Sequence, residues 1–187
     1  MKITKSKLSE VLIIESDAFG DARGWFLETF SQKRYEQAGI KLSFVQDNVS
    51  YSAKNVLRGL HFQLPHSQGK LVQVISGEVF DVAVDIRVGS PTFGQWVADN
   101  LSASNHKQIY IPPGFAHGFC VLSDTALFSY KCTDYYSPAG EGGILFNDPD
   151  LNISWPVGSP IVSKKDDGYP RLRDVPKDKL PKYKEGK

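Results

Sequence analysis

The chain has 187 residues, of which 41% are hydrophobic and 23% charged, a balance typical of a folded globular protein and not of a disordered one. At about 100–200 residues per domain, this length predicts one domain spanning residues 1–187. Lys and Arg total 22 against 21 Asp and Glu, a formal net charge of +1. Bulk charge therefore gives no attraction to nucleic acid or to an anionic membrane, and we expect neither as a partner.

The sequence shows no recognisable targeting signal, and we expect a cytoplasmic protein. The first residues form no apolar segment, and no apolar run in the chain approaches the ~18 residues of a membrane span. Cys120 and Cys132 stand in apolar segments without the spacing of a metal site. We expect both to be buried, reduced thiols.

Apolar or alternating segments recur about every 8–12 residues and are separated by Gly- and Pro-containing turns. This spacing predicts an all-β fold, an antiparallel sandwich or barrel with few helices. One helix is expected over residues 32–38, with Ser31 as its N-cap and Gly39 ending it. From about residue 177 the composition predicts a frayed polar tail. The expected strands are 11–14, 25–30, 44–52, 56–63, 71–75, 78–87, 94–100, 107–112, 117–122 and 126–135.

Alternation along these strands indicates which side chains share a face, because successive strand residues point to opposite sides. Lys70 shares a face with Val72, and Tyr130 lies on an apolar face of its own strand. Strict alternation places His61 on the face opposite Arg58. A His, a Lys and a Tyr are thus directed from apolar strand faces, where a barrel interior would turn them toward a ligand.

A single strand histidine such as His61 is more often structural than functional. Arg58 and Gly59 beside it favour function, because a mid-strand Arg needs a partner and a strand Gly allows close approach of a ligand. Arg23, Arg58 and Lys70 all adjoin glycines. With no P-loop in the chain, such placement suits a diphosphate held by side chains.

The segment PPGFAHGF at residues 112–119 resembles the second motif of the cupin superfamily, which implies a jelly-roll barrel. The first cupin motif needs an HxH pair followed by Glu, whereas residues 60–63 read LHFQ. His61 and His117 without a placed carboxylate make a poor site for a first-row metal. The expected fold is therefore a cupin-type jelly-roll barrel of antiparallel strands without a metal.

Longer segments are similar to the dTDP-4-dehydrorhamnose 3,5-epimerase family, and the resemblance extends from about residue 11 to residue 167. They are FGDARG at 19–24, FVQDN at 44–48, RGLHFQ at 58–63, QGKLV at 68–72, GEVFDVAVDIR at 77–87, PGFAHGF at 113–119 and YKCTDYY at 130–136. The resemblance implies an isomerase without metal or cofactor that inverts C3 and C5 of dTDP-4-dehydro-6-deoxy-D-glucose. The product, dTDP-4-dehydro-L-rhamnose, leads to dTDP-L-rhamnose for cell-surface polysaccharide. A homodimer that shares N-terminal strands is also implied.

The resemblance also implies roles for single residues. His61 matches the base that removes a proton next to the ketone, and Asp166 the carboxylate that orients it. Tyr130 matches the acid on the opposite face, and Lys70 the group that stabilises the enolate. Asp167 is adjacent to Asp166, and we take Asp166 because the pattern SxKD fits the family.

The residues implied to bind the nucleotide sugar combine cations for the diphosphate with polar groups for the base. Tyr136 is the expected stacking surface for the base, although alternation does not choose between it and Tyr135. The full set is Arg23, Glu28, Gln46, Asp47, Asn48, Arg58, His117, Tyr136, Glu141 and Lys165.

Three alternatives remain open from the sequence. A 3- or 5-epimerase of a related deoxysugar pathway would share the same catalytic residues. A cupin that only binds a nucleotide sugar would have no need for an opposed acid and base. A metal-dependent cupin would hold an ion and lose its activity to a chelator.

Overall fold

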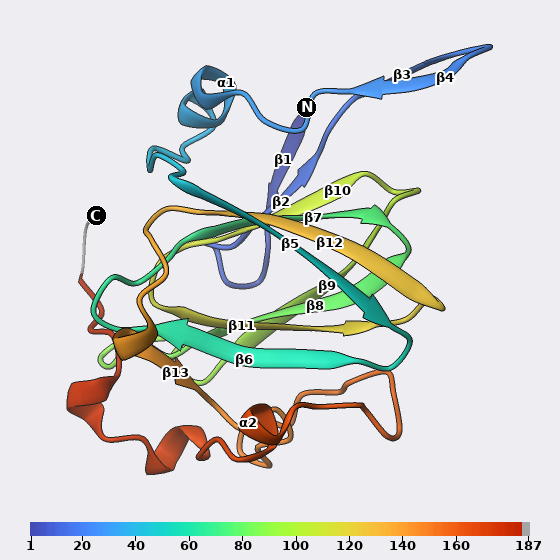
Figure 1. Cartoon of the computed structure of the whole chain (residues 1–187). Coiled ribbons are helices and arrows are strands. Elements are labelled where there is room, and N and C mark those ends of the chain that lie inside the picture. The colour runs from blue at the N-terminus through green and yellow to red at the C-terminus, as the bar shows by residue number, and fades with distance from the viewer. Residues whose placement is uncertain (185–187) are drawn as a thin grey trace.

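Two antiparallel β-sheets face each other in the computed structural model, which describes residues 1–184 (Figure 1). One sheet has the order β1 (Lys2–Lys5), β2 (Leu12–Glu15), β10 (Lys107–Ile111), β7 (Lys70–Ser76), β12 (Thr125–Cys132) and β5 (Gln46–Ala53). The other has the order β13 (Glu141–Gly143), β6 (Leu57–Gln63), β11 (Phe115–Val121), β8 (Glu78–Asp85) and β9 (Trp96–Ser102). The predicted all-β, antiparallel jelly-roll class is confirmed.

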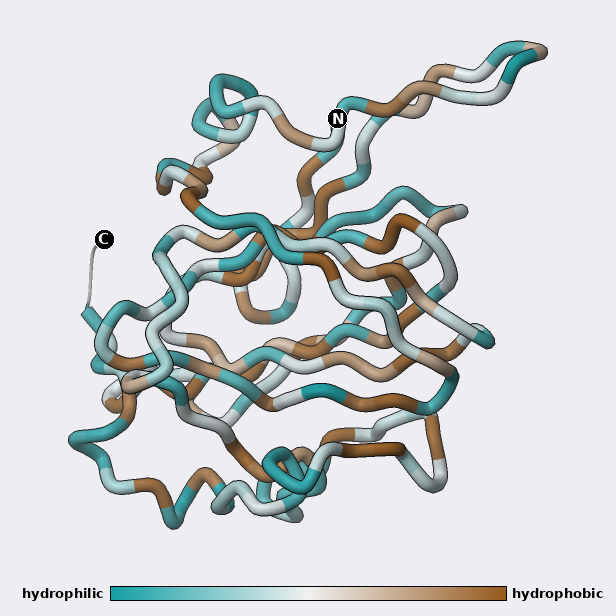
Figure 2. The backbone as a smooth tube through the Cα atoms, in the orientation of Figure 1, coloured by the Kyte–Doolittle hydropathy of each residue, from teal (hydrophilic) through white to brown (hydrophobic). Residues whose placement is uncertain are grey.

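The main hydrophobic core lies between the two sheets. Val72, Phe128 and Phe119 are among its buried members. A second cluster covers the outer face of the five-stranded sheet, where Val82 and Val84 pack against Leu172 and Leu180 from the C-terminal segment. Figure 2 shows hydrophobic residues along the strands and also in the C-terminal segment that lies against this sheet. Both faces of β8 are therefore buried.

The N-terminal part adds a hairpin and a helix outside the two sheets. β3 (Ala18–Asp21) and β4 (Gly24–Leu27) form a hairpin that projects away from the sheets (Figure 1). The strand expected over 25–30 thus ends at Leu27, and its partner β3 was not predicted. The helix α1 (Gln32–Gln37) agrees with the predicted one, although Ser31 makes no side-chain capping bond.

One alternation prediction is wrong, because β6 contains an irregularity. His117 of β11 is opposite His61, but Phe119 is opposite Arg58. The three β11 residues from His117 to Phe119 are thus opposite the four β6 residues from Arg58 to His61, so β6 has one extra residue there, as in a β-bulge. Because of this extra residue, the side chains of Arg58 and His61 lie on the same face of β6. Arg58 Nε accordingly donates to Ser52 Oγ of β5 at 3.1 Å, and both Arg58 and His61 border one cavity.

As far as residue 184, the part of the chain after β12 contains four short helices: η1 (Pro138–Gly140), α2 (Lys164–Asp167), η2 (Leu172–Asp174) and η3 (Lys177–Lys179). The prediction of a frayed tail from about residue 177 is wrong as far as the structure describes the chain. Leu180 is buried, and Lys182 forms an isolated parallel β-bridge with Val88. The Tyr183 N–H donates to the Val88 carbonyl. Apolar residues spaced within a polar sequence hold this segment to the sheet. Residues 185–187 of the expected tail lie outside the described residues.

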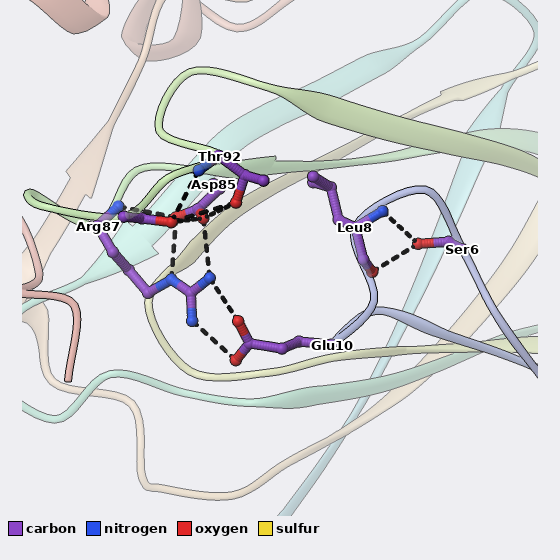
Figure 3. A network of polar contacts seen from close by, with 7 residues as sticks. Ser6, Leu8, Glu10, Asp85, Arg87 and Thr92 are labelled. Atoms are coloured by element: carbon purple, nitrogen blue, oxygen red, sulfur yellow. Dashed lines mark hydrogen bonds and ion pairs between the residues drawn. The ribbon is translucent and has the colours of Figure 1, made fainter. Parts of the chain in front are cut away.

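A buried arginine fastens the N-terminal loop to one end of the sandwich (Figure 3). The Arg87 guanidinium donates to both carboxylate oxygens of Asp85 and to both of Glu10. It also lies over the rings of Phe115 and Tyr183. Asp85 is fully buried, so the ion pair and the hydroxyls of Ser90 and Thr92 compensate its lost hydration.

None of the helices that the structure describes is long and apolar enough to cross a bilayer.

Candidate active site

A histidine and a carboxylate from distant parts of the chain meet at the surface of the five-stranded sheet. His61 Nε2 lies 2.7 Å from Asp166 Oδ1, and the Gly59 N–H approaches Asp166 Oδ2 at 3.4 Å. Burial alone would raise the pKa of Asp166, but the hydrogen bond with His61 and the nearby imidazole hold it below its usual value. Asp166 is buried and Asp167 is exposed. The pair is thus an ionised carboxylate orienting a partly exposed imidazole.

Lys70 and Tyr130 line the same cavity as His61 from the opposite sheet. Their strands β7 and β12 are neighbours, and the Lys70 ammonium lies 5.9 Å from the centre of the Tyr130 ring. Burial lowers the pKa of Lys70 and raises the pKa of Tyr130. The cavity, of about 90 Å³, therefore holds a buried amine and a protonated phenol facing an imidazole.

His117 lies deeper than the sequence suggests. It is buried, it is absent from the lining of the His61 cavity, and its Nε2 lies 2.9 Å from Asp81 Oδ2. Burial lowers the pKa of His117, against the opposing effect of Asp81. The ring stacks on Phe128 in the core between the sheets. The substrate contact expected of His117 stays a prediction.

Four of the nine remaining expected binding residues, Arg58, Tyr136, Glu141 and Lys165, line two cavities that share His61 and Glu141. Tyr136 borders the first of them, and its hydroxyl donates to Glu141. Arg58, Lys165 and Asp166 border the second, of about 380 Å³. Tyr135 is 66% exposed and borders neither.

Gln46 and Asn48 lie beside this group on the inward face of β5. The Gln46 side chain donates to Asn48 and accepts from the Tyr136 N–H, and Asn48 approaches Cys132 Sγ at 3.5 Å. Cys132 and Cys120 are both buried and free, as predicted.

Three expected binding residues are not brought to these cavities by their own chain. Arg23 stands at the tip of the projecting hairpin, 90% exposed and paired with Asp21. Glu28 pairs with Arg34 of α1, and Asp47 pairs with Lys131 on the outward face of β5. Within one subunit their charges are satisfied locally.

Several residues that border the site have no role predicted from the sequence. The first cavity is also lined by Phe62, Gln63, Ser67, Gln68, Gly114 and Phe115. Asp81, the partner of His117, is a fully buried carboxylate in an apolar strand. Alternation could have identified it, because a charged residue facing a core needs a partner. No comparable sequence signal marks Tyr169, which packs beside His61.

The donor sets needed by a metal are not found together in the described part of the chain. Among residues 1–184, no three His, Cys, Asp or Glu side chains gather as a candidate ligand cluster. The expected independence of a metal stays a prediction, because only a measurement on the protein tests it.

The comparisons with known proteins agree with this geometry. The profile of the family described as dTDP-4-dehydrorhamnose 3,5-epimerase matches residues 5–174. The Shigella flexneri enzyme of that name is 59% identical over 168 residues, covering 89% of this chain and 93% of its own, and that of Pseudomonas aeruginosa is 55% identical with the same coverage. A crystal structure of the Legionella pneumophila 3,5-epimerase in complex with dTDP-4-keto-L-rhamnose has a TM-score of 0.96 at 54% identity, covering 98% of both chains. The chain belongs to the dTDP-4-dehydrorhamnose 3,5-epimerase family.

Proposed function

We propose that this protein is an isomerase that converts dTDP-4-dehydro-6-deoxy-D-glucose to dTDP-4-dehydro-L-rhamnose by inversion at C3 and C5, in the biosynthesis of dTDP-L-rhamnose. The observation that carries the proposal is the cavity lined by His61 from one sheet and by Tyr130 and Lys70 from the facing sheet. The family membership and the sugar nucleotide bound by the Legionella pneumophila relative support the same substrate.

Inversion requires a proton to leave one face of the sugar carbon and another to arrive at the opposite face. We assign His61 as the base, because its ring is held by Asp166 and the carboxylate stabilises the imidazolium that forms. Tyr130 extends from the facing sheet, so a sugar between the two presents one face to each. Its raised pKa keeps the phenol protonated at neutral pH, as a proton donor requires.

Lys70 is assigned to the oxygen of the C4 ketone. Removing the proton from C3 or C5 moves negative charge onto that oxygen, and a fixed cation in a site of low dielectric stabilises the enolate. Protonation of the same carbon from the Tyr130 side collapses the enolate to the inverted ketone. The base and acid are restored by proton exchange with water, so the step needs no redox partner.

The nucleotide diphosphate is proposed to lie along Arg58 and Lys165, with Gln46, Asn48 and Tyr136 toward the base. Arg23, Glu28 and Asp47 then belong to the site only if a second subunit brings surfaces together. We therefore propose a homodimer in which the β3–β4 hairpin of one subunit reaches the other's site. The large exposed side chains of Phe19, Trp25 and Phe26 on that hairpin support such a contact.

Solvent deuterium incorporation is the decisive test of the reaction. Incubation of the protein with dTDP-4-dehydro-6-deoxy-D-glucose in D₂O is expected to place deuterium at both C3 and C5. Deuterium at one carbon only would assign a single-position epimerase, and incorporation at neither would leave a protein that binds the nucleotide sugar without turning it over. His61→Asn is the control for chemistry by the proposed base.

Further expectations are tested independently of the chemistry. Activity without a cofactor, unaffected by EDTA, is expected, and elemental analysis checks for a bound ion. A single domain over residues 1–187 predicts one cooperative unfolding transition. The cytoplasmic location is a prediction for cell fractionation.

A further inference from the structure

The carboxylate of the proposed catalytic pair lies outside the sheets, so contacts other than sheet hydrogen bonds must fix its position relative to His61. Asp166 belongs to α2, a helix of four residues, whereas His61 belongs to the strand β6. On the N-terminal side, the Asp166 N–H donates to the Ser163 hydroxyl at 3.1 Å. The Asp167 N–H also donates to the Ser163 carbonyl, and the Gly168 N–H to the Lys165 carbonyl. These bonds lie within the turn, so its position against the sheets depends on other contacts.

The contact on the C-terminal side is made by Tyr169, three residues after Asp166. Its ring lies against the backbone of Gly143: a methyl group added there would stand 2.2–2.4 Å from three of its ring carbons. Gly143 is the β13 residue directly paired with His61. The ring centre is 6.0 Å from that of His61, with the planes at 71°, an edge-to-face geometry. The following residue, Pro170, accepts a hydrogen bond from the Leu145 N–H at 2.9 Å.

The ring, and not the hydroxyl, carries this contact. The Tyr169 oxygen is buried, and no hydrogen-bond partner for it is found among residues 1–184. Burial raises the pKa of this phenol, so it stays neutral beside the Lys165–Glu141 ion pair. The missing side chain at Gly143 makes room for the ring, and the ring in turn abuts the imidazole. Gly143 and Tyr169 therefore connect α2 to the strand that bears His61.

We propose that Tyr169 is a positioning residue for the epimerisation, and that its ring, packed on Gly143, sets the geometry between His61 and Asp166. The inference rests on the proposed function, since it concerns the base of that reaction. Tyr169 acts through His61, and no contact with substrate is assigned to it.

Three variants separate the ring from the hydroxyl and from the pocket that receives it. Tyr169→Phe keeps the ring and removes the unpaired oxygen, so kcat is expected within about 3-fold of the parent. Tyr169→Leu removes the ring, and Gly143→Ala displaces it from the other side. For both, kcat is expected to fall on the order of 10- to 100-fold, because a displacement of about 1 Å at a reacting group has effects of this size. KM is expected to stay within about 2-fold, since the diphosphate contacts are untouched.

The pH profile distinguishes positioning from general damage. In Tyr169→Leu, the acid limb of kcat/KM is expected to move to lower pH, because the imidazolium loses part of the carboxylate that stabilises it. The double variant Tyr169→Leu/Gly143→Ala is expected to be no worse than the poorer single variant. Thermal unfolding of each variant shows whether it is folded at the assay temperature. If Tyr169→Leu is unfolded there, the kcat and pH profile of Gly143→Ala test the inference in its place.

Two outcomes would overturn the inference. One is a Tyr169→Leu enzyme with the parent's kcat and acid limb; the other is a Tyr169→Phe enzyme as impaired as Tyr169→Leu, which would assign the effect to the hydroxyl. His61→Asn distinguishes this failure from failure of the proposed function: if it is inactive while Tyr169→Leu is unaffected, only the positioning role falls. If His61→Asn keeps its turnover, the base itself is misassigned.

Discussion

The Lys70 side chain places its amine where burial opposes a positive charge. Loss of hydration lowers the pKa of its ammonium, and the nearby Cys132, Asp81 and Glu141 offset only part of that effect. Such a cation is a strong partner for a developing enolate, because little solvent screens it. The same burial makes its charge easier to lose as the pH rises.

The pH dependence of Lys70 follows from this direction. A lowered pKa means that the Lys70 ammonium loses its proton at a lower pH than the ammonium of an exposed lysine. We expect kcat to fall along an alkaline limb below the ordinary lysine range. Lys70→Met should lower kcat by about 10²–10³-fold, as for other lost oxyanion donors, and abolish that limb. An unchanged limb in the variant would assign it to another group.

Asp166 gives the complementary prediction on the acid side. Its pKa is lowered in the folded protein, so its pairing with His61 stabilises the fold above the ordinary pKa of an aspartate and is lost as pH falls through the lowered value. Asp166→Asn keeps the shape but cannot hold an imidazolium. We expect kcat to drop by about 10²-fold or more, measured by the deuterium assay, with the fold retained by circular dichroism. Parent-like turnover would remove Asp166 from the mechanism.

At the scale of elements, the close approach of β6 and β11 positions the two histidines. A Cβ on Gly118 would stand 2.8 Å from the Arg58 carbonyl oxygen and 3.2 Å from the Gly59 Cα. The irregularity of β6 between Arg58 and His61 occurs at this contact. The strands can pass this closely only because both positions are glycines.

Gly118→Ala is therefore expected to destabilise the protein. Backbone atoms of β6 cannot move aside as a flexible side chain would, so the added methyl should cost about 1–3 kcal/mol of unfolding free energy. Gly158→Ala is the matched control, because nothing lies within 4 Å of a Cβ there, and its effect should stay within about 0.5 kcal/mol. Equal denaturant midpoints for the two variants would contradict this account of the strand contact.

In the molecule as a whole, the projecting hairpin carries large aromatic side chains that its own subunit leaves exposed. Phe19 and Phe26 are directly paired across it, yet they are 67% and 69% exposed. An exposed aromatic pair on a two-stranded ribbon gains little stability unless a further surface covers it. Arg23 at its tip is likewise far from the cavities of its own chain. A second copy would satisfy both features.

Removal of the aromatic pair tests the assembly. Phe19→Ser/Phe26→Ser is expected to shift the protein from dimer to monomer in sedimentation or light-scattering measurements, and to weaken substrate binding through loss of the partner's Arg23. Phe93→Ser, which removes an aromatic of 41% exposure elsewhere, should leave the dimer intact. A parent protein that is monomeric at assay concentration would refute the shared-hairpin arrangement.

The class of fold and the chemical types of the site residues follow from the amino-acid sequence alone. Regular strand spacing predicted the antiparallel sheets, and apolar alternation placed Lys70 with Val72 and Tyr130 with the core, because a period of two is a local property of a strand. The motifs around His61 and His117 likewise indicated the family, which the comparisons show.

Features that depend on contacts between distant segments become visible in the folded chain and not in the sequence. The β6 irregularity placed Arg58 and His61 on one face, against strict alternation, since an extra residue is defined only by the partner strand. The depth of His117, the packing of the polar tail through Leu180, and the Tyr169–Gly143 contact also arise from segments far apart in the chain. Local patterns specify which face a residue takes, whereas burial and pairing depend on the surfaces that the completed fold brings together.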